Sequence, residues 1–183
     1  MEYENEISQQ DAGSPATNLP DRKNAKQNGE LAELIFMGKA VSLGFGVAKP
    51  WGDSQRFDFI LSRGERLWRV QVKSTTHVHR RGYKVGARKR SIQGQVAYTP
   101  KEIDILVAYI VPREAYYVIP AAAVQGVTTL HLFPSGARKG AGRFEQYREA
   151  WHLMMPAANP APADPTPAES SLAEPGLAKD ALE

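Results

Sequence analysis

The feature of this sequence that most restricts its fold is a pair of alternating apolar segments around a four-residue turn. Residues 57–61 and 67–73 flank Arg63-Gly64-Glu65-Arg66, and Gly64 can supply the positive φ that a type II′ turn needs at its first central position. The pattern predicts a β-hairpin in which Arg63 faces Arg66. One face then carries paired apolar side chains, which we expect in the core: Leu61 with Trp68, Phe59 with Val70, and Phe57 with Val72.

The other face of the predicted hairpin is polar. The same register places Asp58 opposite Gln71, with Lys73 one pleat further along on the same side. An ordinary exposed hairpin would give Asp58 and Lys73 only a surface ion pair of about 0 to 1 kcal/mol. Because Asp58 lies between two phenylalanines, where a carboxylate is unfavourable unless a polar group such as a cation uses it, we favour a functional site.

The rest of the chain adds helices and strands around this hairpin. Apolar residues at helical spacing predict a helix over 31–43, with Asn28 as its cap and Gly44 as its stop. Further strands are expected at 45–48, 103–111 and 116–119, a short helical turn at 121–125, and a closing helix at 144–155. The predicted fold class is therefore α/β, with a mixed β-sheet flanked by helices.

Length and composition limit the chain to one domain with two tails. The 183 residues are 42% apolar and include no cysteine, which excludes a disulfide scaffold and a cysteine nucleophile. Residues 1–24 are polar and acidic and residues 156–183 are rich in proline and alanine, so we predict disordered tails around a folded domain at 25–155. No apolar run is long enough to cross a membrane, and the N-terminus does not resemble a signal peptide. We therefore expect a cytoplasmic protein.

A basic segment follows the hairpin. From Arg66 to Lys101 the sequence has ten Lys or Arg residues and no Asp or Glu. One-signed charge on this scale fits a polyanion, most simply nucleic acid, although a solvated basic face is an alternative interpretation. The predicted DNA contacts lie on a flap over residues 77–90: Arg80, Arg81, Lys84, Arg88, Lys89 and Arg90.

An acid on a helix, an aspartate on a strand and a lysine on the next strand together resemble a known family. The matching stretches are Gly29-Glu30-Leu31-Ala32-Glu33, Leu43-Gly44-Phe45, Phe57-Asp58-Phe59 and Val70-Gln71-Val72-Lys73. They resemble the PD-(D/E)XK nuclease superfamily, which has a restriction-endonuclease-like fold. Phe57 stands where the family name has proline, and Gln71 stands in place of the second acid. This Q-x-K form is similar to that of homing endonucleases encoded in group I introns.

The resemblance implies roles for four side chains. Asp58 and Gln71 would be the strand residues at the metal, and Lys73 would be the catalytic lysine. Glu33 would be the helix acid. Glu30 is the rival for that role, and Glu33 is preferred because its spacing to the glycine after the helix is similar to that in archaeal Holliday-junction resolvases.

The implied chemistry is metal-assisted hydrolysis of a phosphodiester bond. Mg²⁺, which Mn²⁺ could replace, is a hard cation that prefers oxygen ligands and keeps several waters. The expected metal ligands are side-chain oxygens of Asp58, Gln71 and Glu33 and the backbone carbonyl of Val72. Lys73 would orient the attacking water or stabilise charge that develops at the phosphate. Since Gln71 removes one negative charge, we expect weaker metal binding than in a relative with a second acid.

Several functional interpretations are compatible with these residues. The leading one is a Mg²⁺-dependent endonuclease for double-stranded DNA, which acts as a homodimer or homotetramer because one small active site cuts one strand. The alternatives are a nucleic-acid-binding module with a degraded nuclease site, and a Holliday-junction or repair nuclease. A metal site at His77-x-His79 lacks a third ligand nearby, and neither a complete dinucleotide-binding glycine motif nor a Gly-Lys-Ser/Thr phosphate loop is present.

Overall fold

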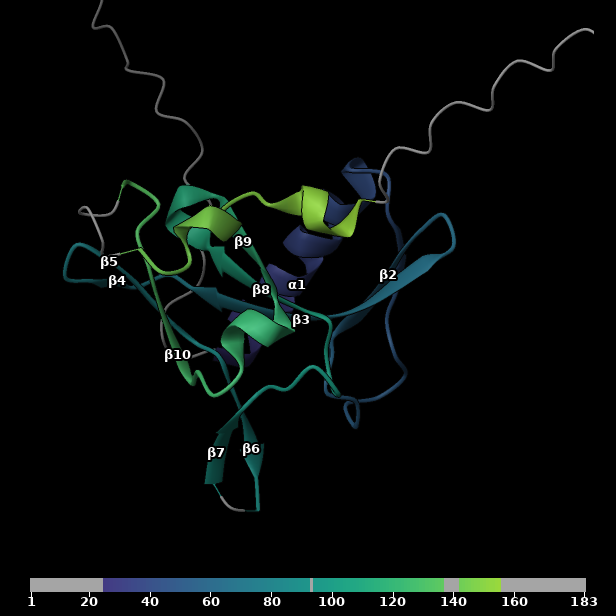
Figure 1. The fold of residues 1–183 in the computed structure, drawn as a ribbon, viewed down its shortest axis with the longest axis horizontal. Helices are drawn as coiled ribbons and strands as arrows, with labels where there is room; N and C mark the ends of the chain where they lie inside the picture. The colour runs from purple at the N-terminus through teal and green to yellow at the C-terminus, as the bar shows by residue number, and fades with distance from the viewer. Residues whose placement is uncertain (1–24, 93, 137–141, 156–183) are drawn as a thin grey trace, which may run out of the picture.

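The fold is known from a computed structural model, which describes residues 25–92, 94–136 and 142–155. The predicted tails, 1–24 and 156–183, lie outside the described residues. The centre is a five-stranded sheet in the order β1 (Gly46–Ala48), β2 (Phe59–Arg63), β3 (Arg66–Thr75), β8 (Ile105–Ile110) and β9 (Ala115–Pro120), drawn in Figure 1. Strands β3 and β8 run parallel and the other neighbours run antiparallel, so the predicted mixed sheet of an α/β fold is confirmed.

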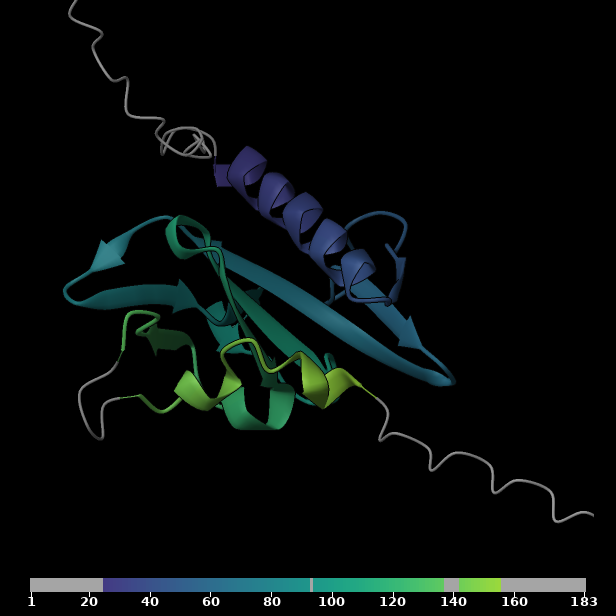
Figure 2. The same cartoon turned by 90° about the horizontal axis from the view of Figure 1, so that it is seen from above.

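Two different layers cover this sheet. Helix α1 (Ala25–Ser42) lies across one face, as Figure 2 shows, and a smaller sheet packs against the other. The smaller sheet has the strand order β10 (Thr129–Leu132), β5 (Gly82–Gly86) and β4 (Val78–His79). Because successive strand residues point to opposite faces, β8 contributes side chains to the core on both faces of the sheet. Ile105, Val107 and Tyr109 pack on the helix side, and Leu106, Ala108 and Ile110 pack on the other.

A third sheet of two strands projects from the body of the molecule. Strands β6 (Arg88–Ser91) and β7 (Gly94–Ala97) form this ribbon, which extends downward in Figure 1. The residues at its base, Ala87 and Tyr98, are both buried. The ribbon is thus anchored at its base, and Arg88, Arg90, Gly94 and Gln95 along it are exposed.

The predicted hairpin has the expected register over most of its length. Phe59 pairs with Val70, Leu61 with Trp68, and Arg63 with Arg66. Gly64 has a φ of 58°, the positive value that the turn requires. The apolar members of these pairs are buried against α1, so alternation alone was enough to predict which face is core.

The predicted pairing of Phe57 with Val72 is wrong. Strand β2 begins only at Phe59, and Phe57 packs on the opposite side of the sheet. The ladder shifts at Asp58, whose N–H donates to the Val70 carbonyl at 2.9 Å and whose carboxylate accepts the Val72 N–H. A side chain thereby replaces the backbone of Phe57 as the partner of β3.

The predicted helix at 31–43 is present but begins earlier. Helix α1 starts at Ala25, so Asn28 lies inside it rather than capping it; Ala25, Lys26 and Gln27 are all good helix formers. The end at Gly44 is confirmed by a φ of 81° and by a Schellman pattern, in which Gly44 N–H donates to Val41 and Phe45 N–H to Ala40. No helix within the described ranges is long and apolar enough to cross a membrane.

The predicted closing helix at 144–155 is wrong. The segment forms two short 3₁₀ turns, Glu145–Tyr147 and Trp151–Met154, separated by Glu149 with a φ of 50°. Glu145 accepts hydrogen bonds from Phe133 N–H and the Tyr117 hydroxyl, and Glu149 accepts from Tyr116 N–H. These carboxylates satisfy backbone and side-chain groups of distant segments, which an isolated helix could not do.

The basic segment 77–90, expected as a flap, contains β4, β5 and the start of β6. Tyr83 and Val85 are buried where β5 pairs with β10. The remaining predictions agree closely with the structure: 45–48 contains β1, 103–111 contains β8, 116–119 lies in β9, and 121–125 contains a 3₁₀ turn at Ala121–Val124.

Candidate active site

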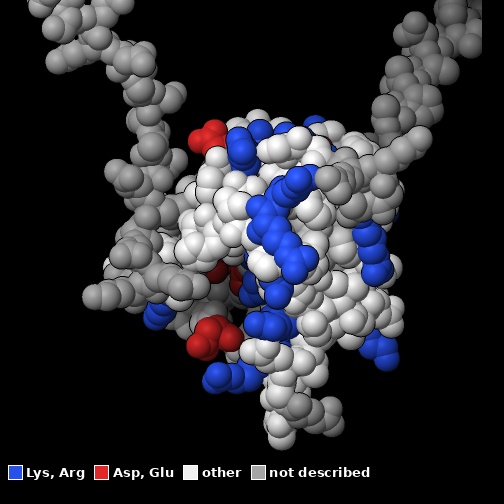
Figure 3. All heavy atoms as spheres, turned by 90° about the vertical axis from the view of Figure 1, so that its left-hand side faces the viewer, with Lys and Arg blue, Asp and Glu red and all other residues white. Residues whose placement is uncertain are grey.

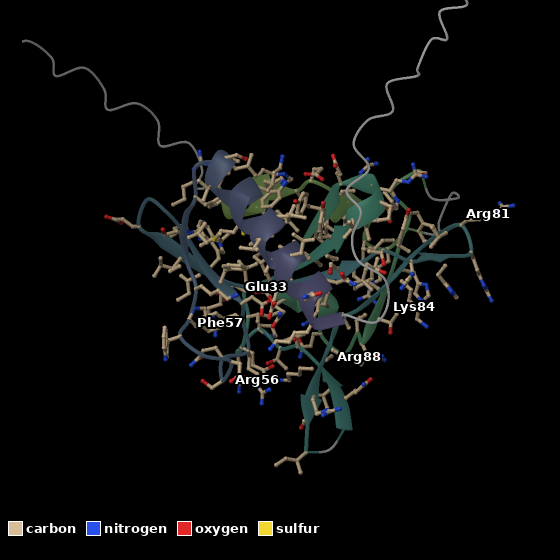
Figure 4. All side chains as sticks on the ribbon, turned by 180° about the vertical axis from the view of Figure 1, so that it is seen from behind. Glu33, Arg56, Phe57, Arg81, Lys84 and Arg88 are labelled. Atoms are coloured by element: carbon tan, nitrogen blue, oxygen red, sulfur yellow. The ribbon has the colours of Figure 1, made fainter. Side chains whose placement is uncertain are left out.

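A cavity of about 350 Å³ lies between the N-terminal half of α1 and the C-terminal half of β3. Glu33, on the part of α1 that crosses the sheet in Figure 4, lines this cavity together with residues from two other places in the sequence. The lining consists of Ala25, Asn28, Gly29, Ala32, Glu33, Asp58 and residues 71–77. All four side chains predicted to be catalytic therefore border one cavity.

Asp58 lies one residue before β2, where the chain joins the sheet. Its carboxylate accepts hydrogen bonds from the Val72 N–H at 2.8 Å and from the side-chain amide of Gln71. Burial raises the pKa of Asp58 to about 6, opposed by the Val72 hydrogen bond and by the positive charge of Lys73, while the charge of Glu33 raises it further. Ionised Asp58 is thus costly at neutral pH unless a cation joins it.

Gln71 is buried, with 6% of its surface exposed, and every polar atom of its side chain has a partner. Its amide nitrogen donates to Asp58 and to the Val72 carbonyl, and its oxygen accepts from the Tyr98 hydroxyl at 3.1 Å. Rotation of the amide would turn the oxygen toward Asp58. Tyr98 could then accept from the amide nitrogen, because a hydroxyl both donates and accepts hydrogen bonds.

Lys73 lies two residues beyond Gln71 on β3 and lines the same cavity. Its side chain is half-buried, with Nζ 5.8 Å from the centre of the Tyr98 ring. Its positive charge lowers the pKa of Asp58. The structure thus brings the carboxylate, the carboxamide and the ammonium group of the predicted constellation together.

Glu33 accepts a hydrogen bond from the Lys49 ammonium group at 2.7 Å. This bond raises the pKa of Lys49, with a smaller contribution from the charge of Asp58. Glu30 is more exposed, does not line the cavity, and has its nearest ion-pair partner in Lys26 at 3.9 Å. Of the two rival helix acids, Glu33 is therefore the one at the site.

The donor set suits a hard divalent cation. The carboxylates of Asp58 and Glu33, the amide oxygen of Gln71 and the Val72 carbonyl are all oxygen donors, the type that Mg²⁺ and Mn²⁺ accept. The partly buried carboxylate of Asp58, with a second carboxylate acting on it, is the observation that favours a cation at this place. Over the described part of the chain, no three His, Cys, Asp or Glu side chains gather into a metal site. Such a centre would therefore use an amide and a carbonyl where others use acids.

The residues predicted to bind DNA fall into two groups. Five are exposed: Arg80, Arg81, Lys84, Arg88 and Arg90. Lys89, in contrast, forms an ion pair with Glu102 and lies 6.0 Å from the centre of the Tyr98 ring. Figure 3 shows Lys and Arg side chains in a band down one side of the molecule, beside a hollow that contains acidic side chains. A polyanion on this band would lie next to the hollow.

Two residues at the site were missed by sequence reasoning. Lys49, the partner of Glu33, belongs to no motif and reaches the site only because β1 places the following loop beside α1. Tyr98 is separated from Gln71 by more than twenty residues. A signal did exist for Tyr98, since a buried glutamine needs a partner for each of its amide atoms.

Comparison with known proteins identifies the family of this chain and a similar solved structure. Residues 23–154 match the family described as PD-(D/E)XK endonuclease. The solved structure of a bacterial homing endonuclease, I-Ssp6803I, is similar to this chain at a TM-score of 0.63 and 31% sequence identity, over 71% of this chain and 92% of that one. MepB, at a TM-score of 0.37 and 13% identity over 67% of this chain and 93% of its own, is too distant to support an argument. No curated protein matches the chain.

Proposed function

The chain belongs to the PD-(D/E)XK endonuclease family, and on that premise we propose that it is a Mg²⁺-dependent endonuclease that cuts double-stranded DNA at specific sites, in the manner of a homing enzyme. The observation that carries the proposal is Asp58, a partly buried carboxylate in contact with Gln71 and in one cavity with Lys73. The 31% identity to a homing endonuclease favours that type over a junction or repair nuclease.

In the proposed centre the metal would be held by Asp58, the Gln71 amide oxygen after rotation, the Val72 carbonyl and Glu33. Mg²⁺ bound there would supply a Lewis acid for the phosphate and a water of lowered pKa. Lys49 donates a 2.7 Å hydrogen bond to Glu33, which holds the two side chains together. The Tyr98 hydroxyl donates to the Gln71 oxygen in the structure and, after rotation of the amide, would accept from its nitrogen instead.

Lys73 is the proposed catalytic cation. Its ammonium group would orient the attacking water or donate hydrogen bonds to the phosphate oxygens as negative charge develops on them. Since it lies in a half-buried position beside Asp58, its charge acts at lower effective dielectric than that of a surface lysine.

The basic side chains would hold the substrate. Arg80, Arg81, Lys84, Arg88 and Arg90 are exposed cations for phosphates, whereas Lys89 is already paired with Glu102. One active site hydrolyses one strand, so cleavage of a duplex would use a symmetric homo-oligomer, a dimer or a tetramer.

Cleavage of a pooled DNA library by the full chain, with and without Mg²⁺ or Mn²⁺, tests the proposal. We expect metal-dependent cuts at a defined sequence, lost in Lys73→Ala and Asp58→Ala but retained in Arg113→Ala, an exposed cation distant in sequence from the site. Cleavage that survives either of the first two substitutions contradicts the assignment. Salt-sensitive binding without cleavage at any metal concentration would indicate a binding module, and a preference for branched DNA would indicate a junction nuclease.

A further inference from the structure

The β6–β7 ribbon has a shape and a chemistry that the proposed catalytic centre does not use. The two strands pair from Arg88 with Ala97 to Ser91 with Gly94, and neither strand joins another sheet. A two-stranded ribbon of this kind fits the major groove of B-DNA. The ribbon therefore has dimensions suited to a duplex.

The alternation of side chains gives the ribbon one inner and one outer face. Lys89 is held on the inner face by its ion pair with Glu102, beside the ring of Tyr98. Arg88 and Arg90, one residue to either side, therefore point to the outer face. Gln95, the cross-strand partner of Arg90, shares that face. All three outer side chains are exposed.

The outer face carries uncompensated positive charge. Apart from their backbone pairing within the ribbon, Arg88 and Arg90 are exposed, and their side chains form no ion pair or side-chain hydrogen bond with another residue in the described ranges. The segment from Arg66 to Lys101 contains no acid, and Glu102, the next one along the chain, is occupied by Lys89 and Thr99. This face complements the charge of a duplex.

The ribbon is also connected to the catalytic cavity. Tyr98 follows β7 directly, and its hydroxyl donates to Gln71 at 3.1 Å. In Figure 4, Arg88 lies at the base of the ribbon, on the side of the molecule where Glu33 faces the viewer. DNA held by the ribbon would thus extend toward the proposed site of hydrolysis.

We propose that the β6–β7 ribbon inserts into the major groove and that Arg90 and Gln95 read base edges there. The inference rests on the proposed function and specifies how the enzyme would choose its target. An arginine pairs with the two acceptors of guanine, and a glutamine with the acceptor and donor of adenine. Cross-strand partners have Cβ atoms about 5 Å apart, a separation between one and two rises of about 3.4 Å along one DNA strand, so the two side chains can reach adjacent base pairs. Arg90 and Gln95 therefore read a guanine and an adenine in neighbouring base pairs.

Selection of bound duplexes from a randomised pool tests the inference. The full chain would be used in EDTA, so that the readout is binding and not cleavage. In Arg90→Ala and in Gln95→Ala we expect the preference at one or two adjacent base pairs to fall about 5- to 150-fold, with the other positions unchanged. Circular dichroism checks that each variant is folded.

Lys84→Ala is the matched control, since Lys84 is exposed on β5, outside the ribbon. This substitution should weaken binding to all sequences alike and reduce the slope of log K against log salt by about 0.9. Unchanged preferences in both ribbon variants, or a wild-type protein that selects no sequence, would overturn the inference. A ribbon-dependent preference in a protein that never cleaves with Mg²⁺ would refute the proposed function alone. Cleavage with ribbon-independent preferences would refute the inference alone.

Discussion

Two aspartates hold strand β3 from its two edges. Asp58 precedes β2 by one residue and accepts the Val72 N–H, while Asp104 precedes β8 by one residue and accepts the Arg69 N–H at 2.7 Å. Asp104 also accepts two hydrogen bonds from the Arg69 guanidinium group, at 2.8 and 3.1 Å. Asp58 instead accepts a hydrogen bond from the neutral side-chain amide of Gln71.

The difference between the two aspartates is the cation. The Arg69 guanidinium holds the pKa of Asp104 below its usual range, whereas burial raises the pKa of Asp58 to about 6. The negative charge of Asp104 is thus balanced by Arg69, whereas the negative charge of Asp58 is only partly balanced by the protein. A structural carboxylate such as Asp104 is paired with a cationic side chain of the protein, whereas a carboxylate that binds a ligand lacks such a partner.

The largest expected effect separates the two aspartates by activity. Asp58→Asn should reduce Mg²⁺-dependent cleavage below detection, because the anionic metal ligand is lost. Asp104→Asn should retain cleavage in the folded protein, because neither Asp104 nor Arg69 lines the cavity. Initial rates of cleavage of the selected DNA target, measured on both variants after thermal unfolding confirms that they are folded, would show the contrast. Equal losses in both variants would remove the distinction.

The next largest effect is on the free energy of unfolding, which Asp58→Asn and Asp104→Asn should change in opposite directions. Because the folded-state pKa of Asp58 exceeds its ordinary value of 3.8, folding becomes less favourable as pH rises from about 4 to about 6. At about 1.36 kcal/mol per pKa unit, Asp58→Asn should raise the free energy of unfolding by up to about 3 kcal/mol at pH 8 and have little effect at pH 3.

The pKa of Asp104 is lowered, so its contribution is favourable above its ordinary pKa and disappears as pH falls below the folded value. Asp104→Asn should therefore destabilise the protein at pH 8 and much less at pH 3. Urea unfolding of both variants in EDTA at several pH values measures these free energies. Added Mg²⁺ should stabilise the wild type but not Asp58→Asn, and pH profiles with the same sign at both sites would contradict the comparison.

A smaller effect is expected at Tyr98, which acts on the metal through Gln71. Tyr98→Phe removes the hydroxyl that orients the amide and should weaken Mg²⁺ affinity by about 10- to 100-fold, the usual effect of losing such a support. Isothermal titration with Mg²⁺ measures it, with Tyr83→Phe as a control for loss of a buried tyrosine hydroxyl. A purely packing role for Tyr98 predicts equal affinities for all three proteins.

The smallest effect is expected from Gln71→Glu. The added carboxylate should increase Mg²⁺ affinity at pH 8 by up to about tenfold, since its charge attracts the cation but also repels Asp58 and favours a shared proton. Titration of thermal stability with Mg²⁺ at pH 6 and pH 8 would detect the gain, which should be larger at pH 8. Affinity that falls at both pH values would mean that the amide, and not its oxygen alone, is needed.

Sequence patterns predicted the parts of the fold that depend on neighbours along the chain. The turn at Gly64 and the alternation of Phe59, Leu61, Trp68 and Val70 determine the hairpin, and the hairpin brings Asp58 to Gln71. The family resemblance inferred from these residues is confirmed. Asp58 and Gln71 could therefore be placed together from local information alone.

The early start of α1 is a local error, but the others involve partners outside the local pattern. Glu149 breaks the predicted closing helix because it binds Tyr116, and β5 forms because β10 covers it. Phe57 leaves the hairpin because the Asp58 carboxylate takes the backbone donor of Val72. The alternation of apolar residues and their helical spacing cannot predict such tertiary contacts.

The buried residues at the base of the β6–β7 ribbon have a practical consequence. Ala87 and Tyr98 lie in the body of the fold, so the strands between them could be lengthened without disturbing the core. An insertion of two residues in each strand would keep the same side chains on the outer face. An insertion of one residue in each strand would move the side chains beyond it to the opposite face. The ribbon is therefore a suitable segment to redesign for another DNA target, with its strands lengthened or shortened by two residues at a time.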